Sequence, residues 1–439
     1  MLTPKDVVIR NLGACRIDSP MKSHFPAAAL NSLFVNENEG VLLHAVLGED
    51  GIGPDHPECK VIFELAGPRE KIYFDPSKTR CGIVTCGGLC PGLNEVIRSL
   101  VRQLWFVYGI HRIHGFKYGY QGFIAKYGHS VVDLTYEMVD GIQFSGGTML
   151  GSSRGEQDPV EVVDCLERMG INVLFAIGGD GTLRGAQSIA AEIEKRGLKI
   201  ALVGIPKTID NDIMYVDESF GFQTAYSRAV ETLISAHVES KGAPNGIGLV
   251  KLMGRHSGFI ACHAALAMND VNFLLIPEVP FNLEGENGLL NNLRKRLLRR
   301  NHAVIAVAEG AGQEHLKATG AKDASGNVIL QDIGLFMKDQ IASYFKQIKM
   351  DVNLKYLDPS YVIRSVPASP QDNIYCMRLA HNAVHAAMSG KTELVVGRWN
   401  GHFVHVPMAL ATSGCKKVNP VGDLWLSVLE ATGQPMQFE

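Results

Sequence analysis

The chain has 439 residues, of which 46% are hydrophobic and 20% charged, and its formal net charge at pH 7 is −3. This length exceeds the size at which a single hydrophobic core stops growing, so we expect two lobes with appendages. The near-neutral charge argues against a nucleic acid or an anionic membrane as partner. The nine cysteines are scattered, and the amino terminus lacks a secretory pattern. We therefore expect a cytoplasmic protein with reduced thiols.

The residue pattern changes once along the chain, near residue 80. Residues 1–79 mix Pro, Gly and acidic clusters with short apolar pieces, which predicts an irregular amino-terminal extension. From Arg80 onward, short apolar strands, Gly-rich turns and amphipathic helices alternate, as in parallel βαβ units. We therefore predict an α/β fold with two doubly wound, Rossmann-like lobes. The expected strands are 81–85, 173–177, 200–205, 246–251, 271–276, 303–308 and 394–397.

The expected first lobe comprises residues 80–222 with roughly 365–393, and the second comprises 223–364 with roughly 394–439. Residues 289–300 predict an amphipathic helix with a basic, solvated face. Ligands of open α/β sheets bind at the carboxyl ends of strands, so the loops that follow the expected strands are the candidate sites.

Two glycine-rich loops, within residues 85–94 and 176–186, each join an expected strand to an expected helix. Glycines let backbone N–H groups approach phosphate oxygens, and a helix amino terminus adds partial positive charge. In the second loop, Gly179 and Gly181 leave room for a phosphate chain, and Asp180 is placed to hold a bridging Mg²⁺. The alternatives are a ligand-free turn for the first loop and a helix cap for Asp180.

A third loop, PKTIDND at residues 206–212, follows another expected strand and contains a cation, a hydroxyl and two carboxylates. Asp210 is suited to accept a proton from an alcohol, Thr208 to hydrogen-bond a phosphoryl oxygen, and Lys207 to neutralise charge in the transition state. The alternative is a purely structural Asx-turn.

Two more loops present an arginine, whose planar fork suits phosphate oxygens. One is the small-residue loop 146–155 with Arg154, and the other is KLMGRHSG at 251–258 with Arg255. The alternative is a surface salt bridge for Arg154 and a plain surface arginine for Arg255.

Taken together, these motifs resemble the phosphofructokinase superfamily over roughly residues 67–397. GPREKIYF, GGDGT, PKTIDND, KLMGR and KYLDPSYVIRS resemble its plant and trypanosomatid branch, in which an extension precedes the catalytic core. The resemblance implies a 6-phosphofructokinase, which transfers the γ-phosphate of MgATP to the 1-hydroxyl of fructose 6-phosphate. It also implies a nucleotide-binding first lobe, a sugar-phosphate-binding second lobe, and a homodimer or homotetramer.

The resemblance also implies the roles of individual residues. Asp210 would be the base, Thr208 and Arg255 would stabilise the moving phosphoryl group, Asp180 would hold Mg²⁺, and Asp212 would support the carboxylate cluster of the active site. The implied nucleotide-binding residues are Gly88, Tyr120, Arg154, Gly179, Asp180, Gly181, Thr182 and Gly185, with a packed core position as the alternative for Tyr120. The implied sugar-phosphate-binding residues are Thr208, Asp210, Asp212, Met253, Gly254, Arg255, Glu309, Lys355, Tyr361 and Arg364.

The identity of the phosphoryl donor depends on two positions. In the family, Gly at position 181 leaves space for the α-phosphate of ATP, whereas Asp there favours pyrophosphate. Lys207 is common in pyrophosphate-dependent enzymes, so a pyrophosphate-dependent phosphotransferase is the main alternative. Less favoured alternatives are an NAD or lipid kinase, because GGDGT occurs there too, and a non-catalytic sensor of nucleotides or sugar phosphates.

Overall fold

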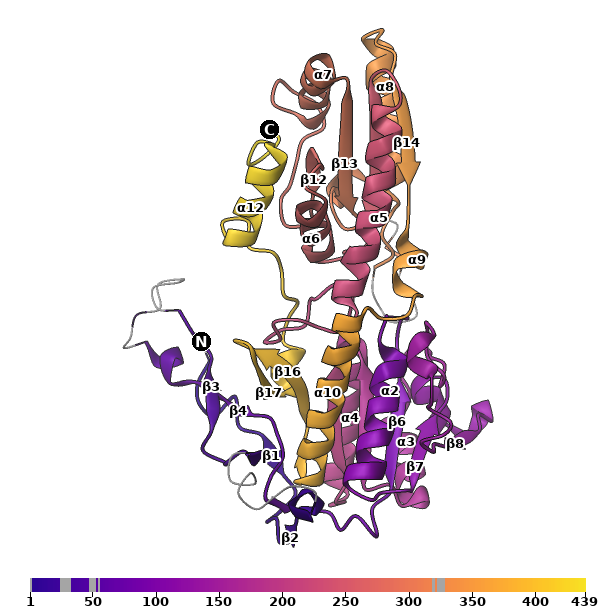
Figure 1. The fold of residues 1–439 in the computed structure, drawn as a ribbon, viewed down its shortest axis with the longest axis vertical. Helices are drawn as coiled ribbons and strands as arrows, with labels where there is room; N and C mark the ends of the chain where they lie inside the picture. The colour runs from indigo at the N-terminus through magenta and orange to yellow at the C-terminus, as the bar shows by residue number, and fades with distance from the viewer. Residues whose placement is uncertain (1, 24–32, 47–52, 54–55, 318–319, 322–327) are drawn as a thin grey trace. The chain divides into compact units, whose positions relative to one another are not determined.

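The computed structural model describes residues 2–23, 33–46, 53, 56–317, 320–321 and 328–439. The chain divides into two compact units (Figure 1). Unit 1 comprises Met1–Thr208, Ile213–Gly221 and Val366–Gly414, and unit 2 comprises Ile209–Asp212, Phe222–Ser365 and Cys415–Glu439. The division therefore cuts through the PKTIDND segment.

Unit 1 is built on a nine-stranded sheet with the order β3-β4-β17-β16-β10-β9-β6-β7-β8. The central strands from β16 to β7 are parallel, and the pairs toward both edges are antiparallel. Every residue of β6, β9 and β10 is buried, as expected of parallel strands that are covered on both faces. The strands are β3 (Gly40–Leu42), β4 (Ile62–Leu65), β6 (Cys81–Thr85), β7 (Ile113–Phe116), β8 (Val131–Asp133), β9 (Val173–Gly178), β10 (Ala201–Pro206), β16 (Leu394–Trp399) and β17 (His402–Pro407).

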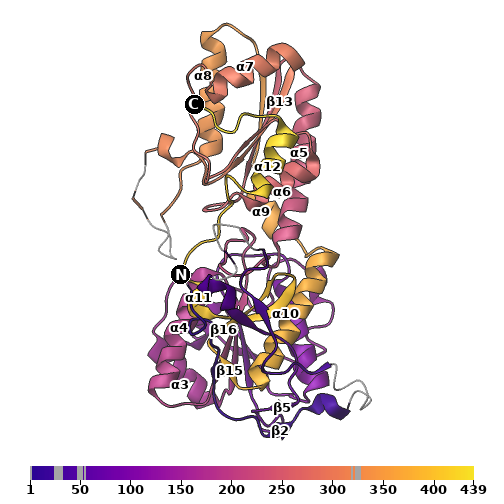
Figure 2. The same cartoon turned by 90° about the vertical axis from the view of Figure 1, so that its left-hand side faces the viewer.

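Helices cover both faces of this sheet. Figure 2 shows α3 and α4 on one side of β16 and α10 on the other, and α10 packs against α2. In α4 the buried residues Leu183, Ala186, Ala190 and Ile193 recur at the spacing of one helix face. The helices of unit 1 are α2 (Leu93–Arg102), α3 (Pro159–Met169), α4 (Asp180–Lys195), α10 (Pro370–Met388) and α11 (Met408–Ala411).

The amino-terminal extension is more regular than expected. Strand β4 pairs with β17 and with β3, so the extension widens the main sheet. Short antiparallel pairs also join β1 (Arg10–Asn11) to β15 (Lys391–Thr392) and β2 (Ile17–Asp18) to β5 (Lys71–Ile72). Residues 394–414 belong to unit 1, although we expected them in the second lobe. The reason is that β16 pairs with β10 in the main sheet, and β17 pairs antiparallel with β16.

A cluster of charged side chains joins the extension to the sheet. The Glu64 carboxylate contacts Arg69 Nη2 at 2.7 Å, Lys391 Nζ at 2.8 Å and His405 Nδ1 at 3.1 Å. Arg69 and Lys391 are only 5% and 4% exposed, so their charges depend on this carboxylate. Burial works to raise the pKa of Glu64, but the hydrogen bond from His405 and the charge of Lys391 outweigh it and hold that pKa at about 2.

We expect Glu64→Gln to lower the unfolding free energy at pH 7 by about 3 kcal/mol, because a lowered carboxyl pKa stabilises the folded state at about 1.4 kcal/mol per unit. This stabilisation is complete above the ordinary Glu pKa and disappears as pH falls toward 2. Urea unfolding at pH 7, 5, 4 and 3 should therefore show a difference between wild type and variant that shrinks with pH.

Glu37→Gln is the matched control for this prediction. Glu37 contacts the same two cations but is 65% exposed, so its loss should cost less than about 1 kcal/mol. Equal effects of the two substitutions would contradict the assignment of Glu64 as the central carboxylate.

Unit 2 is built on a parallel four-stranded sheet with the order β12-β13-β11-β14. Helices α5 and α6 pack on one face, and α7 and α8 pack on the other (Figure 2). The strands are β11 (Gly246–Leu252), β12 (Phe273–Leu275), β13 (His302–Ala308) and β14 (Asn353–Leu357). The helices are α5 (Phe222–Lys241), α6 (Phe259–Met268), α7 (Leu289–Arg300), α8 (Ile333–Gln347), α9 (Ser360–Arg364) and α12 (Asp423–Thr432).

The two helix-covered sheets, one with a parallel centre and the other wholly parallel, confirm the predicted fold class. Each of the seven expected strands is present within a few residues of its predicted bounds, and the predicted basic helix coincides with α7. The buried leucines of α7 face the core while Arg294, Lys295, Arg299 and Arg300 are exposed, as a solvated face requires. In the part of the chain that the structure describes, no helix combines the length and apolarity needed to cross a bilayer.

Candidate functional site

In unit 1, Lys207 holds the three glycine-rich or polar loops together. Its backbone N–H donates to the Gly178 carbonyl at 3.0 Å, which joins the third loop to the second. Its ammonium group donates to the Gly88 carbonyl at 2.7 Å, which joins the third loop to the first. The side chain is buried, so this cation lies beneath the loops and orients them. The predicted phosphate loops therefore lie together at the carboxyl ends of β6, β9 and β10.

The small-residue loop 146–155 packs against the first loop through several hydrogen bonds. Gly87 N–H donates to the Ser153 carbonyl at 3.0 Å, and Ser152 Oγ donates to the Gly87 carbonyl at 2.6 Å. Thr85 Oγ1 donates to the Gly151 carbonyl at 2.8 Å. Arg154 is exposed at the end of this loop. The structure therefore brings the predicted Arg154 segment to the same edge of unit 1 as the phosphate loops.

Asp180 is the first residue of α4 and does not cap the helix. The N-cap is Gly179, which offers no side chain, and the Asp180 carboxylate instead pairs with Arg184 Nε at 2.9 Å. With 52% of its side chain exposed, this carboxylate is accessible to a metal ion. Among the described residues, no group of three or more His, Cys, Asp or Glu side chains could enclose a metal. A single carboxylate still fits Mg²⁺, which is commonly held by one or two carboxylates together with phosphate oxygens and water.

The glycines of the second loop differ in whether the fold itself requires glycine at their positions. A Cβ on Gly178 would lie 2.2 Å from Thr182 Oγ1, and one on Gly185 would lie 2.8 Å from the Tyr120 ring, so packing excludes side chains there. A Cβ on Gly181 would meet no atom within 4 Å, and its φ lies outside the left-handed region. Neither packing nor backbone conformation requires glycine at 181, which supports a ligand as the reason for it.

Tyr120 lies in the core of unit 1. It is 7% exposed, and its hydroxyl group donates to the backbone carbonyl of Thr182 at 2.8 Å. Burial raises the pKa of Tyr120 well above its ordinary value. These contacts support the packed alternative over direct nucleotide contact, because the ring supports the first turn of α4 from beneath. Thr182 itself is also buried.

In unit 2, the predicted base Asp210 lies in a cluster of carboxyl groups. Burial raises the pKa of Asp210 well above its usual range, and the negative charges of Asp212 and Glu309 raise it further. A hydrogen bond from the Arg255 backbone and the charge of its guanidinium group oppose this rise. The Asp210 backbone is fixed by Ser257, whose Oγ donates to its carbonyl at 2.9 Å. This arrangement keeps the carboxyl group basic, as a proton acceptor requires.

The loop after β11 brings Arg255 to the same carboxylate cluster. Gly254 has φ +131°, and a Cβ there would lie 2.6 Å from the Ser257 carbonyl oxygen, so the turn requires glycine. Gly310 N–H donates to the Gly254 carbonyl at 3.0 Å, which connects this loop with Glu309. On the other side, the Asp212 backbone carbonyl accepts from Lys416 N–H at 2.7 Å. Met253 lies between this turn and the end of β11.

The predicted sugar-phosphate cations are more exposed. Lys355 is exposed on β14, and in the described chain its ammonium group has no ion-pair partner. In α9 the Arg364 guanidinium lies 4.7 Å from the centre of the Tyr361 ring. Burial raises the pKa of Glu309, while the charges of Arg255, Lys251 and Arg364 oppose that rise. Arg364 is therefore close enough to this cluster to act on it electrostatically, whereas no contact connects Lys355 with Glu309.

Sequence reasoning missed Lys251 and its two partners. Lys251 interrupts an otherwise buried strand, and its ammonium group contacts Asp332 Oδ2 at 2.9 Å and Asp358 Oδ2 at 2.8 Å. A lysine inside a strand whose other residues are apolar or glycine was the available signal, since such a charge requires a partner.

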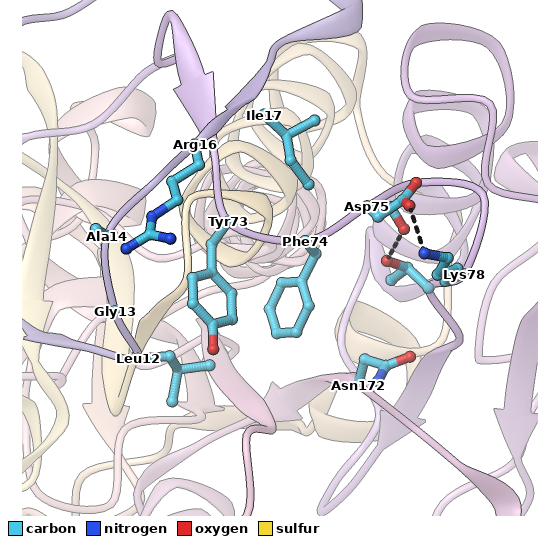
Figure 3. Close-up of a pocket in the computed structure, with 11 residues that line it drawn as sticks. Leu12, Gly13, Ala14, Arg16, Ile17, Tyr73, Phe74, Asp75, Lys78 and Asn172 are labelled. Carbon is cyan, nitrogen blue, oxygen red and sulfur yellow. Dashed lines mark hydrogen bonds and ion pairs between the residues drawn. The ribbon is translucent and has the colours of Figure 1, made fainter.

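A cavity of about 630 Å³ lies elsewhere in unit 1 (Figure 3). Its walls include Tyr73 and Phe74, whose rings meet edge to face, and Asn172, which directly precedes β9. Lys78 at its rim pairs with Asp75 at 3.4 Å. The cavity therefore lies at the amino-terminal ends of the parallel strands, whereas the predicted phosphate loops follow their carboxyl-terminal ends.

Residues 80–387 match the family model described as Phosphofructokinase. The chain belongs to the phosphofructokinase family. A Borreliella burgdorferi protein named ATP-dependent 6-phosphofructokinase is 52% identical, and the alignment covers 99% of this chain and 98% of that protein. A Trypanosoma brucei brucei protein of the same name is 44% identical, with 85% of this chain and 76% of that protein covered. The predicted family and its resemblance to trypanosomatid members are confirmed, and the predicted activity agrees with these names.

A solved structure shares the phosphofructokinase fold. The pyrophosphate-dependent phosphofructokinase from Marinobacter aquaeolei matches with a TM-score of 0.66 and 18% identity, over 81% of this chain and 91% of that chain. At this identity the likeness supports the fold and not the choice of donor.

Proposed function

We propose that this chain is a 6-phosphofructokinase that transfers the γ-phosphate of MgATP to the 1-hydroxyl group of fructose 6-phosphate. The observation that carries the proposal is the PKTIDND segment. Its Lys207 holds the phosphate loops of unit 1 together, and only three residues later Asp210 lies in the carboxylate cluster of unit 2. The names of the relatives support the same reaction.

In unit 1, the loops around Lys207 would bind the nucleotide. Backbone N–H groups of the first turn of α4 and the positive end of its dipole suit phosphate oxygens. Asp180 would hold Mg²⁺, which when bound neutralises charge on the phosphate chain. Arg154 and the space beside Gly181 would accept the rest of the nucleotide, while Tyr120 would support Thr182 and Gly185 without touching it.

In unit 2, Asp210 would take the proton from the sugar hydroxyl, and Asp212 would keep the Asp210 carboxyl basic through its charge. Arg255 would stabilise negative charge on the moving phosphoryl group, with Thr208 donating a hydrogen bond to it. Glu309, Met253 and Gly254 would contact the sugar, and Lys355, Tyr361 and Arg364 would bind its 6-phosphate. Because Lys355 and Tyr361 are exposed, a second copy of the chain in a homo-oligomer could share this part of the site.

ATP is the proposed donor because the chain does not need glycine at position 181 for its own fold. Lys207 does not decide between the two donors, because its buried ammonium group donates a hydrogen bond to the Gly88 carbonyl.

We expect the purified protein to form fructose 1,6-bisphosphate with MgATP, and rates with MgATP at saturation to exceed rates with Mg-pyrophosphate by at least about tenfold. Initial rates at varied fructose 6-phosphate, with NAD and diacylglycerol as alternative acceptors and with EDTA as the magnesium control, test this. Turnover with pyrophosphate only would overturn the donor, and phosphorylation of NAD or diacylglycerol without turnover of fructose 6-phosphate would overturn the acceptor.

A further inference from the structure

Lys251 occupies an unusual position for a charged side chain. It lies in β11, between β13 and β14 in the sheet of unit 2, and its side chain is only 12% exposed. A buried ammonium group destabilises the fold unless carboxylates compensate its charge. Lys251 is therefore tolerated in this strand because it forms two ion pairs. Lys251 is also two residues before Met253, in the turn that brings Arg255 to the carboxylate cluster.

Each carboxylate that pairs with Lys251 also accepts hydrogen bonds at the start of a helix. Asp332 is the N-cap of α8, where its Oδ1 accepts from Leu335 N–H at 3.1 Å. Asp358 stands two residues before α9, and its Oδ1 accepts from Ser360 N–H at 3.0 Å and from the Ser360 hydroxyl group. The ammonium group of Lys251 therefore connects β11 to the beginnings of two helices, one of which is α9.

Helix α9 is short and packs against α5. It spans only five residues, too few for a helix that is stable by itself. Only Ile363 is buried in it, while Tyr361 is 76% exposed and Val362 is also exposed. The direction in which Tyr361 and Arg364 project therefore depends on the packing of this helix against α5, with Ile363 buried, and on the Asp358 anchor at its start.

We propose that Lys251 is a positioning residue for sugar-phosphate recognition, which acts through Asp358 to fix the orientation of α9 and thereby of Tyr361 and Arg364. Lys251 itself does not touch the substrate in this assignment. The inference rests on the proposed function, because it takes Tyr361 and Arg364 as ligands of the sugar 6-phosphate. Its effect is a specific one: it sets the affinity for fructose 6-phosphate and leaves the nucleotide loops of unit 1 unaffected.

The test measures KM for fructose 6-phosphate and KM for ATP separately. We expect Lys251→Met and Asp358→Asn each to raise KM for fructose 6-phosphate at least tenfold and to leave KM for ATP within twofold. Lys251→Arg keeps both ion pairs and should restore KM for fructose 6-phosphate to within about threefold of wild type. The double variant Lys251→Met/Asp358→Asn should be no worse than Lys251→Met alone, because both changes remove the same link.

Asp332→Asn is the matched control. It removes the other ion pair of Lys251 but leaves the Asp358 anchor, so it should lower the thermal unfolding midpoint and keep KM for fructose 6-phosphate within twofold. Equal KM effects of Asp332→Asn and Asp358→Asn, or a parallel rise of both KM values in Lys251→Met, would overturn the positioning role. An Arg364→Ala variant with unchanged KM for fructose 6-phosphate would instead show that the sugar-phosphate assignment of α9 has failed.

Discussion

Asp210→Asn is expected to lower kcat by about 10²-fold to 10⁴-fold, the usual contribution of a positioned general base. Asparagine has nearly the same shape but cannot accept the proton of the sugar hydroxyl. The measurement is steady-state kcat with MgATP and fructose 6-phosphate, together with calorimetric titration of each ligand. Binding of both ligands should be retained, and a variant with full turnover would remove Asp210 from this role.

Stability provides the control for this substitution. Burial and the charges of Asp212 and Glu309 raise the pKa of Asp210, so its ionised form opposes folding once pH exceeds its ordinary value. Asparagine removes this buried charge, and the thermal unfolding midpoint at pH 7 should therefore stay the same or rise. A large fall in the midpoint would mean that the lower kcat results from destabilisation of the fold and not from loss of the base.

The same raised pKa predicts the acid limb of the wild-type pH profile. The base form of Asp210 is lost as pH falls through its raised pKa, so kcat should begin to decline well above the ordinary Asp value of 3.8. Asp212→Asn removes one of the charges that raise this pKa and should move the acid limb to lower pH.

Patterns that are local in sequence predicted the fold well. The strands β6, β9 and β10 are continuous apolar segments bounded by glycine loops, and their burial on both faces makes such segments easy to recognise. The antiparallel strands of the extension could not be predicted in this way. Strand β4 has four residues, and it exists as a strand because β17, more than 300 residues later, offers an edge for pairing.

In the candidate site too, local sequence patterns predicted some features, while others depend on residues that are distant in the sequence. Loop composition singled out the two glycine-rich loops and the PKTIDND segment as candidates, because glycine, lysine and aspartate are unusual together after buried strands. Composition could not distinguish a tyrosine that contacts a ligand from one that supports a loop, and the Tyr120 hydroxyl bonds to a backbone carbonyl that no motif specifies. Nor could it show that Lys251 reaches two carboxylates located 81 and 107 residues further along the chain.

Gly181→Asp is expected to reduce kcat/KM for ATP by roughly 10²-fold or more, because juxtaposed like charges in a binding site cost several kcal/mol. The carboxylate would occupy the space beside the first turn of α4, where nothing in the chain lies within 4 Å of the position that a Cβ would take. It should not harm the fold, since an acidic side chain near a helix amino terminus is favourable. Initial rates at varied ATP, at varied fructose 6-phosphate and with pyrophosphate measure the effect.

Two further substitutions separate charge from size at this position. Gly181→Ala places a methyl group in open space and should keep kcat/KM for ATP within about tenfold of wild type. A tenfold change corresponds to about 1.4 kcal/mol. Gly181→Asn has the size of aspartate without its charge, so it should fall between the two. In all three variants KM for fructose 6-phosphate should change less than twofold, because the sugar phosphate is assigned to residues of unit 2. If Gly181→Asp used ATP as well as Gly181→Ala does, the space beside Gly181 would not be where the nucleotide phosphates bind, and the preference for ATP would have to arise from other residues.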